Sequence, residues 1–436
     1  IIDGLRIDGE RTFTVTYRSP DCASQARLNT VIMPIASFAP AFREFALAFQ
    51  AEQAGVPSLA DWQKAYREAF RGAPWQPDAS ASQGSIDDIP WGGQFLIQTN
   101  DGADFVITTT SGLVIGENSF DTPAFEALAG KDVNLLLDPP FAERADLRSL
   151  GDIQLYEAPG YAMDRLVFNL SDPNYPRPAF IDAEPLEQLP HPILWDIRVR
   201  RAIRLAIDTQ ALIDGVLHGG GVALNGAYSP ASWAYDPTLP AWEYDPLEAD
   251  RLLDEAGWRG NERRRCVGCM YPERRSSLSL RLMVDNDEVR QQVAEMIRVQ
   301  LGRVGIAVEI YYDDGSRQDF DLLLTGTSGA SLWAREPDLT YQFAQTMDVL
   351  GVRDGNLGSY VNPELESLLE QARSIPTCSI QARADIYQQV QRLLNEDLPA
   401  TWLYARNDFY SARGIVNFSP LPGEPLWNIT DWVVTR

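Results

Sequence analysis

The chain has 436 residues, a length that predicts two or three compact units rather than one. Apolar residues make up 45% of the chain and charged residues 22%, which excludes wholesale disorder, collagen and coiled coil. The formal net charge of −24 repels phosphate backbones and anionic lipid headgroups, so nucleic acid is not an expected partner. No apolar run approaches the roughly 18 residues that cross a bilayer, and the sequence therefore predicts no transmembrane helix.

The first part of the chain has both strand and helix patterns. β-Branched and aromatic residues alternate over residues 12–17, which predicts a strand. Apolar residues recur at helical spacing over residues 40–72, which predicts helical structure. Two further strands are expected at 95–97 and 104–107, with a turn at 100–102 between them.

One stretch of the later chain has the pattern of a βαβ unit. Strand patterns over 278–284 and 306–312 flank a helix over 286–303 that carries apolar residues on one face. Gly305 stands where a helix end favours a residue of positive φ. Asp285 or the residue after it can cap the front of the helix.

The remaining patterns continue this alternation of strand and helix. A buried strand is expected at 320–324, followed by amphipathic helices at 363–374 and 380–396. Short strands are expected around 402–404 and 432–434 near the end of the chain. Alternation of this kind is typical of α/β layers.

The two histidines, His191 and His218, do not indicate a catalytic centre. Their spacing suggests no pairing with a serine or cysteine, so a hydrolase triad is not predicted. His218 precedes three glycines at a helix end, where a cation is stabilised by up to about 1 kcal/mol. The chain has 61 acidic residues, so a carboxylate pair of the glycosidase kind stays open, although no particular pair stands out.

The four cysteines are Cys22, Cys266, Cys269 and Cys378. Cys266 and Cys269 have the spacing of half a zinc ribbon, but a second C-x-x-C is missing and no histidine lies nearby, so no metal site is predicted. A local disulfide or free thiols are expected in the loop before the strand at 278–284. Redox catalysis would lie outside its usual strand-to-helix context.

Several motifs follow one another in an order that resembles a known family. They are the run Trp195–Asp208 with the pattern D-x-R-V-R-x-A-I-x-x-A-I-D, the loop Gly219–Gly221, the run Tyr244–Trp258 and the run Gly358–Leu365. Over about residues 170 to 410 the chain is similar to the extracellular solute-binding proteins of family 5. Those proteins are the peptide-, dipeptide- and nickel-binding receptors of ABC importers.

The resemblance implies an α/β fold with two lobes, the periplasmic-binding-protein-like type II fold with hinge crossovers. Residues 1–168 would form lobe I, residues 169–403 lobe II, and residues 404–436 would return to lobe I. Members of the family carry well over a hundred further residues before the point where this chain starts. Lobe I is therefore expected to be partial here, with its N-terminal portion absent from this sequence and present in the native molecule.

The crossovers between the lobes are expected near Phe168 and Asn169 on the way out and near Leu403 and Tyr404 on the return. The resemblance implies a hinge motion that closes the lobes around a ligand. A ligand stabilises the closed state only by contacting both lobes.

The resemblance also implies site residues. In peptide-binding members an aspartate three positions after a tryptophan takes the α-ammonium group of the ligand; here Glu336 follows Trp333 at that distance. An enclosed carboxylate discriminates strongly against a ligand without the amine. The neighbouring Arg335 offers Glu336 an internal partner as the alternative. Trp333 stacks on a ligand or fills core, and Trp91 and Tyr228, each beside a turn, are candidates to line the cleft.

The function expected from the resemblance is that of an extracytoplasmic receptor, periplasmic or anchored to the cell surface as a lipoprotein. It would capture a peptide or similar small polar solute and present it to an ABC permease in the membrane. The receptor is expected to be a monomer without cofactor, metal or enzymatic activity. Two alternatives stay open: a secreted hydrolase with a carboxylate pair in the same cleft, and a sensory derivative that has lost transport.

Overall fold

The computed structural model describes residues 124–435 with short gaps, and five strands and a few single positions before them. The gaps are 132, 178–179, 182–183, 261, 313–319, 328–335, 349–354 and 377, and the single positions are 22, 48, 49, 51, 61, 64 and 65. Most of the helical stretch expected at 40–72 therefore lies outside the described residues.

The described strands and helices follow the predicted alternation. The strands are β1 (Ile2–Ile7), β2 (Phe13–Tyr17), β3 (Phe95–Asn100), β4 (Asp104–Thr109), β5 (Val114–Glu117), β6 (Leu135–Leu137), β7 (Gln154–Phe168), β8 (Phe180–Ile181), β9 (Glu184–Pro185), β10 (Gly221–Ala223), β11 (Trp258–Arg259), β12 (Arg265–Cys266), β13 (Ser279–Val284), β14 (Ala307–Tyr312), β15 (Leu322–Thr327), β16 (Ala400–Ala412), β17 (Ile415–Val416) and β18 (Val433–Val434). The α-helices are α5 (Ala124–Ala129), α6 (Arg144–Ser149), α7 (Ile197–Leu205), α8 (Thr209–Val216), α9 (Pro246–Glu255), α10 (Glu288–Arg303), α12 (Thr340–Phe343), α13 (Pro363–Ser374) and α14 (Ile380–Asp397), and three single 3₁₀ turns cover Phe141–Glu143, Gln345–Met347 and Ile429–Asp431.

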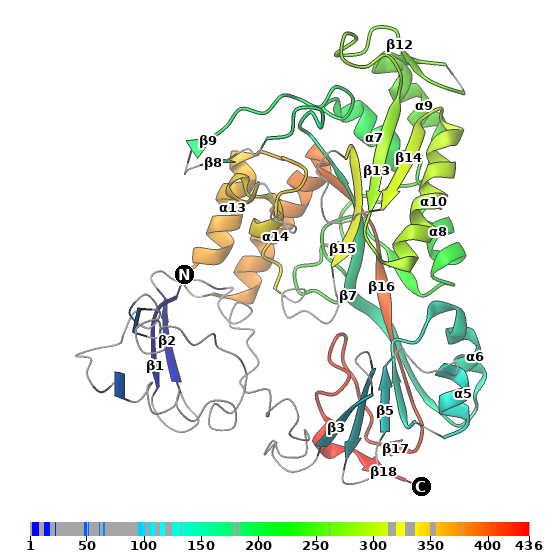
Figure 1. Ribbon diagram of the computed structural model, residues 1–436, viewed down its shortest axis with the longest axis vertical. Helices are drawn as coiled ribbons and strands as arrows, with labels where there is room; N and C mark the ends of the chain where they lie inside the picture. Colours follow the sequence, from blue (N-terminus) through cyan, green and yellow to red (C-terminus); the bar gives the residue numbers. More distant parts are fainter. Residues whose placement is uncertain are drawn as a thin grey trace.

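One sheet of ten strands runs through the molecule, in the order β14-β13-β15-β7-β16-β6-β5-β4-β3, with β10 also paired to β16. Figure 1 shows an upper body, which contains β13 to β15, and a lower body, which contains β3 to β6. The strands β7 and β16 run from one body into the other. Helices α8 to α10 lie on one side of the upper sheet and α13 and α14 on the other.

The two long strands β7 and β16 hold the bodies together. They have 15 and 13 residues and pair antiparallel along almost their whole length. In the upper body β7 also pairs with β15, and in the lower body β16 also pairs with β6. The sequence predicts only a short strand at 402–404, because residues 400–405 are buried on both faces and therefore lack the alternation that marks a half-exposed strand.

The βαβ unit is confirmed: β13 and β14 are parallel, and α10 connects them. Gly305 follows the end of α10 with φ of 77°, the conformation that the pattern predicts. The N-cap is Asp287 rather than Asp285, and its side chain accepts a hydrogen bond of 2.9 Å from the Arg290 N–H. Asp285 instead accepts from the Arg290 guanidinium at 2.7 Å, so it supports the first turn from the side.

The molecule has separate hydrophobic cores. The largest packs residues of β7, β13, β15 and β16 against the surrounding helices in the upper body. Two smaller cores lie in the lower body, one around Leu128, Leu147 and Phe409 and one around Leu135 and Ile415. Because each body buries its own apolar residues, the bodies can behave as distinct units joined through strands.

Both pairs of cysteines form disulfides in the structure. Cys266 joins Cys269 in the loop after α9, which is one of the two local states expected for that loop. Cys22 joins Cys378 across 356 positions of the chain, a pairing that the spacing leaves open. The described cysteines are therefore not available as zinc ligands.

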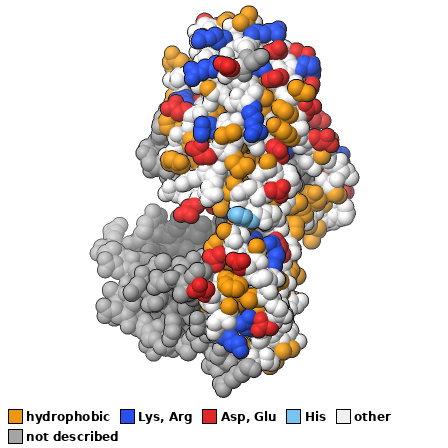
Figure 2. All heavy atoms as spheres, turned by 90° about the vertical axis from the view of Figure 1, so that its right-hand side faces the viewer, with side chains coloured by type: hydrophobic (Ala, Val, Ile, Leu, Met, Phe, Trp, Pro, Cys, Tyr) orange, Lys and Arg blue, Asp and Glu red, His pale blue; other side chains and the backbone are white. Residues whose placement is uncertain are grey.

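The surface mixes charges of both signs. Figure 2 shows acidic and basic side chains interspersed over the upper part of one face, with apolar side chains between them. The strongly negative net charge is thus not gathered into a single field on this face. Among the helices that the structure describes, none is both long and apolar enough to cross a membrane.

A buried group of charges fixes the place where the two long strands pass each other. Asp164 on β7 is 1% exposed at its side chain and accepts from Arg290 of α10 at 2.7 Å and from Arg406 of β16 at 2.9 Å. Arg406 also donates two hydrogen bonds of 3.0 Å to Asp287. Burial opposes the charge on Arg406, but the Asp164 and Asp287 carboxylates outweigh it and raise its pKa.

Replacement of Asp164 by alanine should therefore destabilise the protein by about 3 to 5 kcal/mol, because two arginines lose a carboxylate that they share in the interior. Urea unfolding at constant pH measures the change in the free energy of unfolding. Glu295→Ala, which removes the partner of Arg298 on an exposed face of α10, is the control and should have a much smaller effect. Equal effects of the two substitutions would contradict the structural importance of Asp164.

Candidate functional site

The short stretch 336–345, hereafter the Glu336 segment, is the described part of the site expected from the resemblance. It follows the gap at 328–335. Trp333, Arg335 and Trp91 lie outside the described residues, and their roles stay predictions.

The Glu336 carboxylate forms an ion pair with the guanidinium of Arg383 on α14, and the two side chains are only 11% and 5% exposed. Arg383 also donates to the carbonyl oxygen of Ala372 in α13 at 3.0 Å and lies over the Trp233 ring. Burial opposes the charge on Arg383, but its hydrogen bond to Glu336 outweighs burial and raises the pKa of the guanidinium. The charge of Glu336 is thus balanced inside the protein.

The sequence does not predict this pairing of Glu336. The sequence suggests a ligand ammonium or Arg335 as its partner, and both stay predictions, while the structure adds an ion pair with Arg383, 47 positions away. A signal for Arg383 does exist in the sequence. It lies on the apolar face of α14 with Tyr387 and Val390, and all three residues are buried. An arginine on such a face requires acceptors from elsewhere in the chain.

Tyr228 belongs to the same cluster but lies in the core rather than on a wall of the cleft. It is 4% exposed, and its hydroxyl donates to the carbonyl oxygen of Pro337 at 2.6 Å. Its ring packs edge-on against Tyr387 at 5.8 Å between centroids. Burial raises the pKa of Tyr228 well above its ordinary value, so the hydroxyl keeps its proton and stays a donor. Tyr228 therefore fixes the Glu336 segment from its buried side.

Further contacts fix the rest of the Glu336 segment. The Asp338 side chain accepts from the Thr340 N–H at 3.0 Å and from its hydroxyl at 2.5 Å, which shapes the turn before α12. The Gln345 N–H donates to the Glu366 carboxylate of α13 at 2.8 Å. The segment is thus tied to α13 and, through Arg383, to α14.

A small pocket lies beside α12, between Arg165 of β7, Gln342, Phe343, Asn356 and Tyr360. Arg165 donates to the Gln342 side chain, and Asn356 donates to the carbonyl oxygen of Tyr360 at 2.6 Å. The pocket has room for about one water molecule. It is therefore too small to enclose a peptide.

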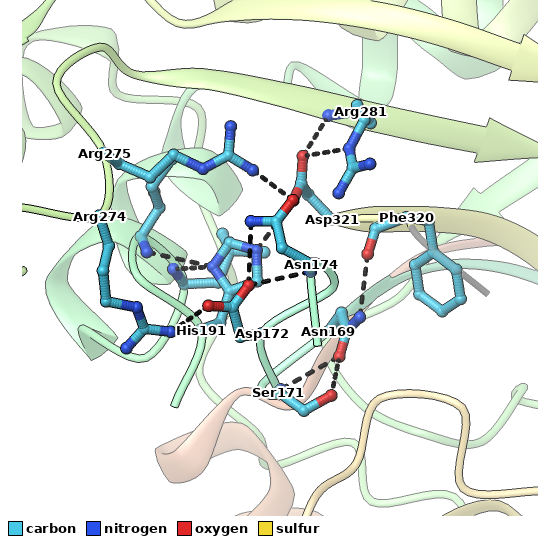
Figure 3. Close-up of polar contacts among 12 residues, drawn as sticks. Asn169, Ser171, Asp172, Asn174, His191, Arg274, Arg275, Arg281, Phe320 and Asp321 are labelled. Atoms are coloured by element: carbon cyan, nitrogen blue, oxygen red, sulfur yellow. Dashed lines mark hydrogen bonds and ion pairs between the residues drawn. The ribbon is translucent and has the colours of Figure 1, made fainter. Parts of the chain in front are cut away.

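The expected outward crossover, Phe168 and Asn169, lies inside the upper body. Phe168 is fully buried and pairs with Leu322 of β15. The Asn169 side chain donates to the Phe320 carbonyl oxygen at 2.9 Å and accepts from the Ser171 N–H and hydroxyl, as Figure 3 shows. These hydrogen bonds attach the end of β7 to the chain just before β15 of the upper sheet.

The passage between the bodies lies earlier on β7. The pairing of β7 with β15 reaches back to Met163, and β16 changes register between Ala405 and Asn407. Leu403 and Tyr404, the expected return point, are fully buried in the upper body. The position of the passage between the bodies is hard to predict from the sequence, because both strands continue through it.

A buried histidine stands next to the end of β7. His191 is fully buried, and its Nδ1 accepts from the N–H groups of Ile193 and Leu194 at 3.1 and 2.9 Å. Its Nε2 therefore carries the proton and donates to Asp321 at 3.0 Å (Figure 3). Burial lowers the pKa of His191 below its ordinary value.

Asp321 balances several positive groups around this histidine. It accepts from the Arg281 N–H at 2.6 Å, and the Arg275 guanidinium lies 3.5 Å away. Nearby, Arg274 forms an ion pair with Asp172 and donates to the Pro190 carbonyl oxygen (Figure 3). Because His191 and the carboxylates of Asp321 and Asp172 bind neighbouring groups, we interpret the cluster as structural.

Two side chains that could take part in acid–base chemistry are engaged inside the protein. His191 is buried against Asp321, and Glu336, the acidic residue expected in the cleft, is neutralised by Arg383. Within the described part of the chain, no group of three or more histidine, cysteine, aspartate or glutamate side chains is arranged to hold a metal ion.

Comparison with known proteins decides the family. The model of the bacterial extracellular solute-binding proteins, family 5 Middle, matches residues 119–346, just over half of the chain. The chain belongs to this family. The match includes β7, the βαβ unit and the Glu336 segment, whereas Arg383 and β16 lie beyond it.

Curated relatives of this family 5 member include peptide-binding proteins. The oligopeptide-binding protein AppA of Bacillus subtilis (strain 168) is 28% identical over 254 residues, which are 55% of this chain and 44% of AppA. The chain thus spans less than half of that relative's length.

Solved structures confirm the α/β periplasmic-binding-protein fold. The structure of AppA from Bacillus subtilis in complex with a nonapeptide has a TM-score of 0.61 at 19% identity and covers 99% of this chain and 78% of that one. NikZ from Campylobacter jejuni in complex with Ni(L-His) has a TM-score of 0.63 at 16% identity, with coverages of 99% and 78%. At this level of identity the likeness establishes the fold.

The His191 cluster predicts a pH dependence of stability. The unfolded chain takes up a proton at His191 near pH 6.5, whereas the folded protein resists it because Nδ1 already accepts two N–H groups. Stability from this group is therefore full above about pH 6.5 and falls by up to about 1.4 kcal/mol per pH unit as the pH drops toward the lowered pKa of the folded state. Urea unfolding between pH 7.5 and 5 measures the slope.

His191→Asn is the control for this pH dependence, because an asparagine oxygen can accept from the same two N–H groups without titrating. The variant should lose the part of the slope that begins near pH 6.5. An unchanged slope would assign the pH dependence to other groups.

The pairing of Glu336 predicts a loss of stability in the absence of any ligand. Glu336→Gln leaves the Arg383 guanidinium buried without its carboxylate and should cost about 3 kcal/mol. The double variant Glu336→Gln with Arg383→Met should recover much of the loss, because the buried charge disappears. Glu370→Gln, at an exposed partner of Arg373, is the control. Unfolding curves that match the wild type for Glu336→Gln would show that the pair contributes nothing.

Proposed function

We propose that this chain is the receptor of an ABC importer and captures a peptide or a similar small polar solute between two lobes. The observation that carries the proposal is the pair of continuous strands, β7 and β16, which joins two bodies with separate cores. Such a connection allows the bodies to move as units while the chain stays paired between them. Family membership supports the same conclusion.

The lobes follow the boundaries that the sequence suggests, with one adjustment. Lobe I comprises residues 1–168 and the return 404–436, and lobe II comprises residues 169–403. The change of strand partners at Met163 and the register shift near Asn407 support crossovers a few residues closer to the lower body. The hinge motion would then act on the Asp164 charge group rather than on Phe168.

The Glu336 segment forms part of the wall of lobe II in this proposal. Arg383 and Tyr228 fix its position, so a ligand meets a preformed surface and spends little binding energy on ordering it. The balanced charge of Glu336 argues for a positioning role. Recognition of a ligand ammonium by Glu336 would require Arg383 to share or release the carboxylate. Trp333, Arg335 and Trp91 remain candidates for direct contact.

A peptide is the ligand class that the relatives favour. AppA of Bacillus subtilis is named an oligopeptide-binding protein, and its structure holds a nonapeptide. The structure of NikZ holds Ni(L-His), so a metal complex of an amino acid is the second candidate. Both ligands contain amino acids.

The receptor works outside the cytoplasm, in the periplasm or on the cell surface, as a monomer that passes its solute to a membrane permease without breaking a bond. The family description supports the extracellular location. The hydrolase alternative is weaker because Glu336, the carboxylate expected in the cleft, is paired with Arg383, and His191 is buried against Asp321. The sensory alternative keeps the same ligand site. It differs from the transport receptor only in its partner, which would not be a permease.

Thermal melting with peptides of two to nine residues tests the proposal. A peptide at a hundred times its Kd stabilises the folded state by about 2.7 kcal/mol, which raises the melting temperature. Mass spectrometry after incubation should recover the peptide intact, whereas a shortened peptide would indicate the hydrolase. If nickel with histidine stabilises the protein and none of the peptides does, the proposed ligand becomes a metal complex of an amino acid. If neither stabilises the protein, capture of these solutes is refuted.

A further inference from the structure

The disulfide between Cys22 and Cys378 ties an early part of the chain to the corner between α13 and α14. Cys378 lies in the exposed connection of these helices, and Cys22 is half-buried against it. The Cys22 N–H also donates to the carbonyl oxygen of Arg373, in the last turn of α13, at 2.9 Å. A covalent bond and a hydrogen bond thus hold the same corner.

The corner that carries this disulfide also holds the Glu336 segment. Arg383, in the second turn of α14, donates to the Ala372 carbonyl oxygen of α13 and pairs with Glu336. A second connection runs from Glu366 of α13 to the Gln345 N–H. Displacement of the corner therefore acts first on Arg383 and its pair with Glu336, whereas Glu366 lies in the first turn of α13, at the other end of that helix.

We propose that Cys22–Cys378 is a reducible latch that sets the position of the Glu336 segment. An external dithiol attacks the exposed disulfide, and the disulfide takes up two electrons and two protons to become the Cys22 and Cys378 thiols while the dithiol becomes a disulfide. The released corner then loosens Arg383 and, with it, the Glu336 segment. This inference concerns the fold of the segment and stands independently of which solute the protein binds.

The second disulfide supplies a matched control. Cys266 and Cys269 are three positions apart, and the loop that carries them packs near Gly257, where the Val267 N–H donates to the Gly257 carbonyl oxygen at 2.8 Å. Among the contacts of this loop in the described part of the chain, none reaches the Glu336 segment. Removal of this disulfide should change only its own surroundings.

Amide hydrogen exchange read by mass spectrometry tests the latch. In Cys22→Ser with Cys378→Ser, exchange should accelerate about tenfold or more in residues 373–383 and also in the Glu336 segment. In Cys266→Ser with Cys269→Ser, exchange in the Glu336 segment should match the wild type. Acceleration confined to 373–383, or equal acceleration in both variants, would overturn the proposal.

A second measurement covers the case in which the double serine variant fails to fold. The Cys266→Ser with Cys269→Ser protein is purified with its remaining disulfide intact and then treated with dithiothreitol in native buffer. Thiol labelling should report two new thiols, at Cys22 and Cys378, and exchange in the Glu336 segment should accelerate as they appear. Labelling without that acceleration would refute the coupling.

Discussion

The buried charges around Asp164 are the constraint on which the rest of the structure depends. Two bodies with their own cores are joined through β7 and β16, and Asp164 fixes both strands to α10 at the passage. Arginine is suited to this position because its guanidinium spans two carboxylates, as Arg406 does with Asp164 and Asp287. The ladder between β7 and β16 is irregular near this point, where the register shifts between Ala405 and Asn407, so the buried charges add contacts where the backbone pairing is interrupted.

The candidate site follows from this arrangement because it belongs to the upper body near the passage. Its described part is held from behind: Arg383 takes the Glu336 carboxylate, and Tyr228 takes the Pro337 carbonyl oxygen. In the proposed receptor, selectivity for a ligand would come from the shape and polar groups of this fixed wall, and less from a free charge. The proposed latch between Cys22 and Cys378 closes the corner of α13 and α14 that carries Arg383.

The sequence-based prediction names a segment for the site but not the partners of that segment within the chain. The stretch around Glu336 lies inside the residues that match the family, and its place in a ligand site stays a prediction. The partner Arg383 is not found this way, since ion pairs form between residues brought together by folding. Tyr228 is placed wrongly for a related reason: a tyrosine beside a turn has the same local sequence whether it faces solvent or core.

Local features were readable from the chain itself. The positive φ at Gly305 depends on residues within a few positions of one another, and the βαβ unit follows from three consecutive local patterns, so the sequence contains most of their cause. Contacts between distant residues were settled by packing alone. The disulfide between Cys22 and Cys378 joins positions 356 apart, and the length of β16 reflects burial on both faces by elements from elsewhere in the chain. Neither leaves a periodic signal, because the cause lies in what surrounds a residue in space.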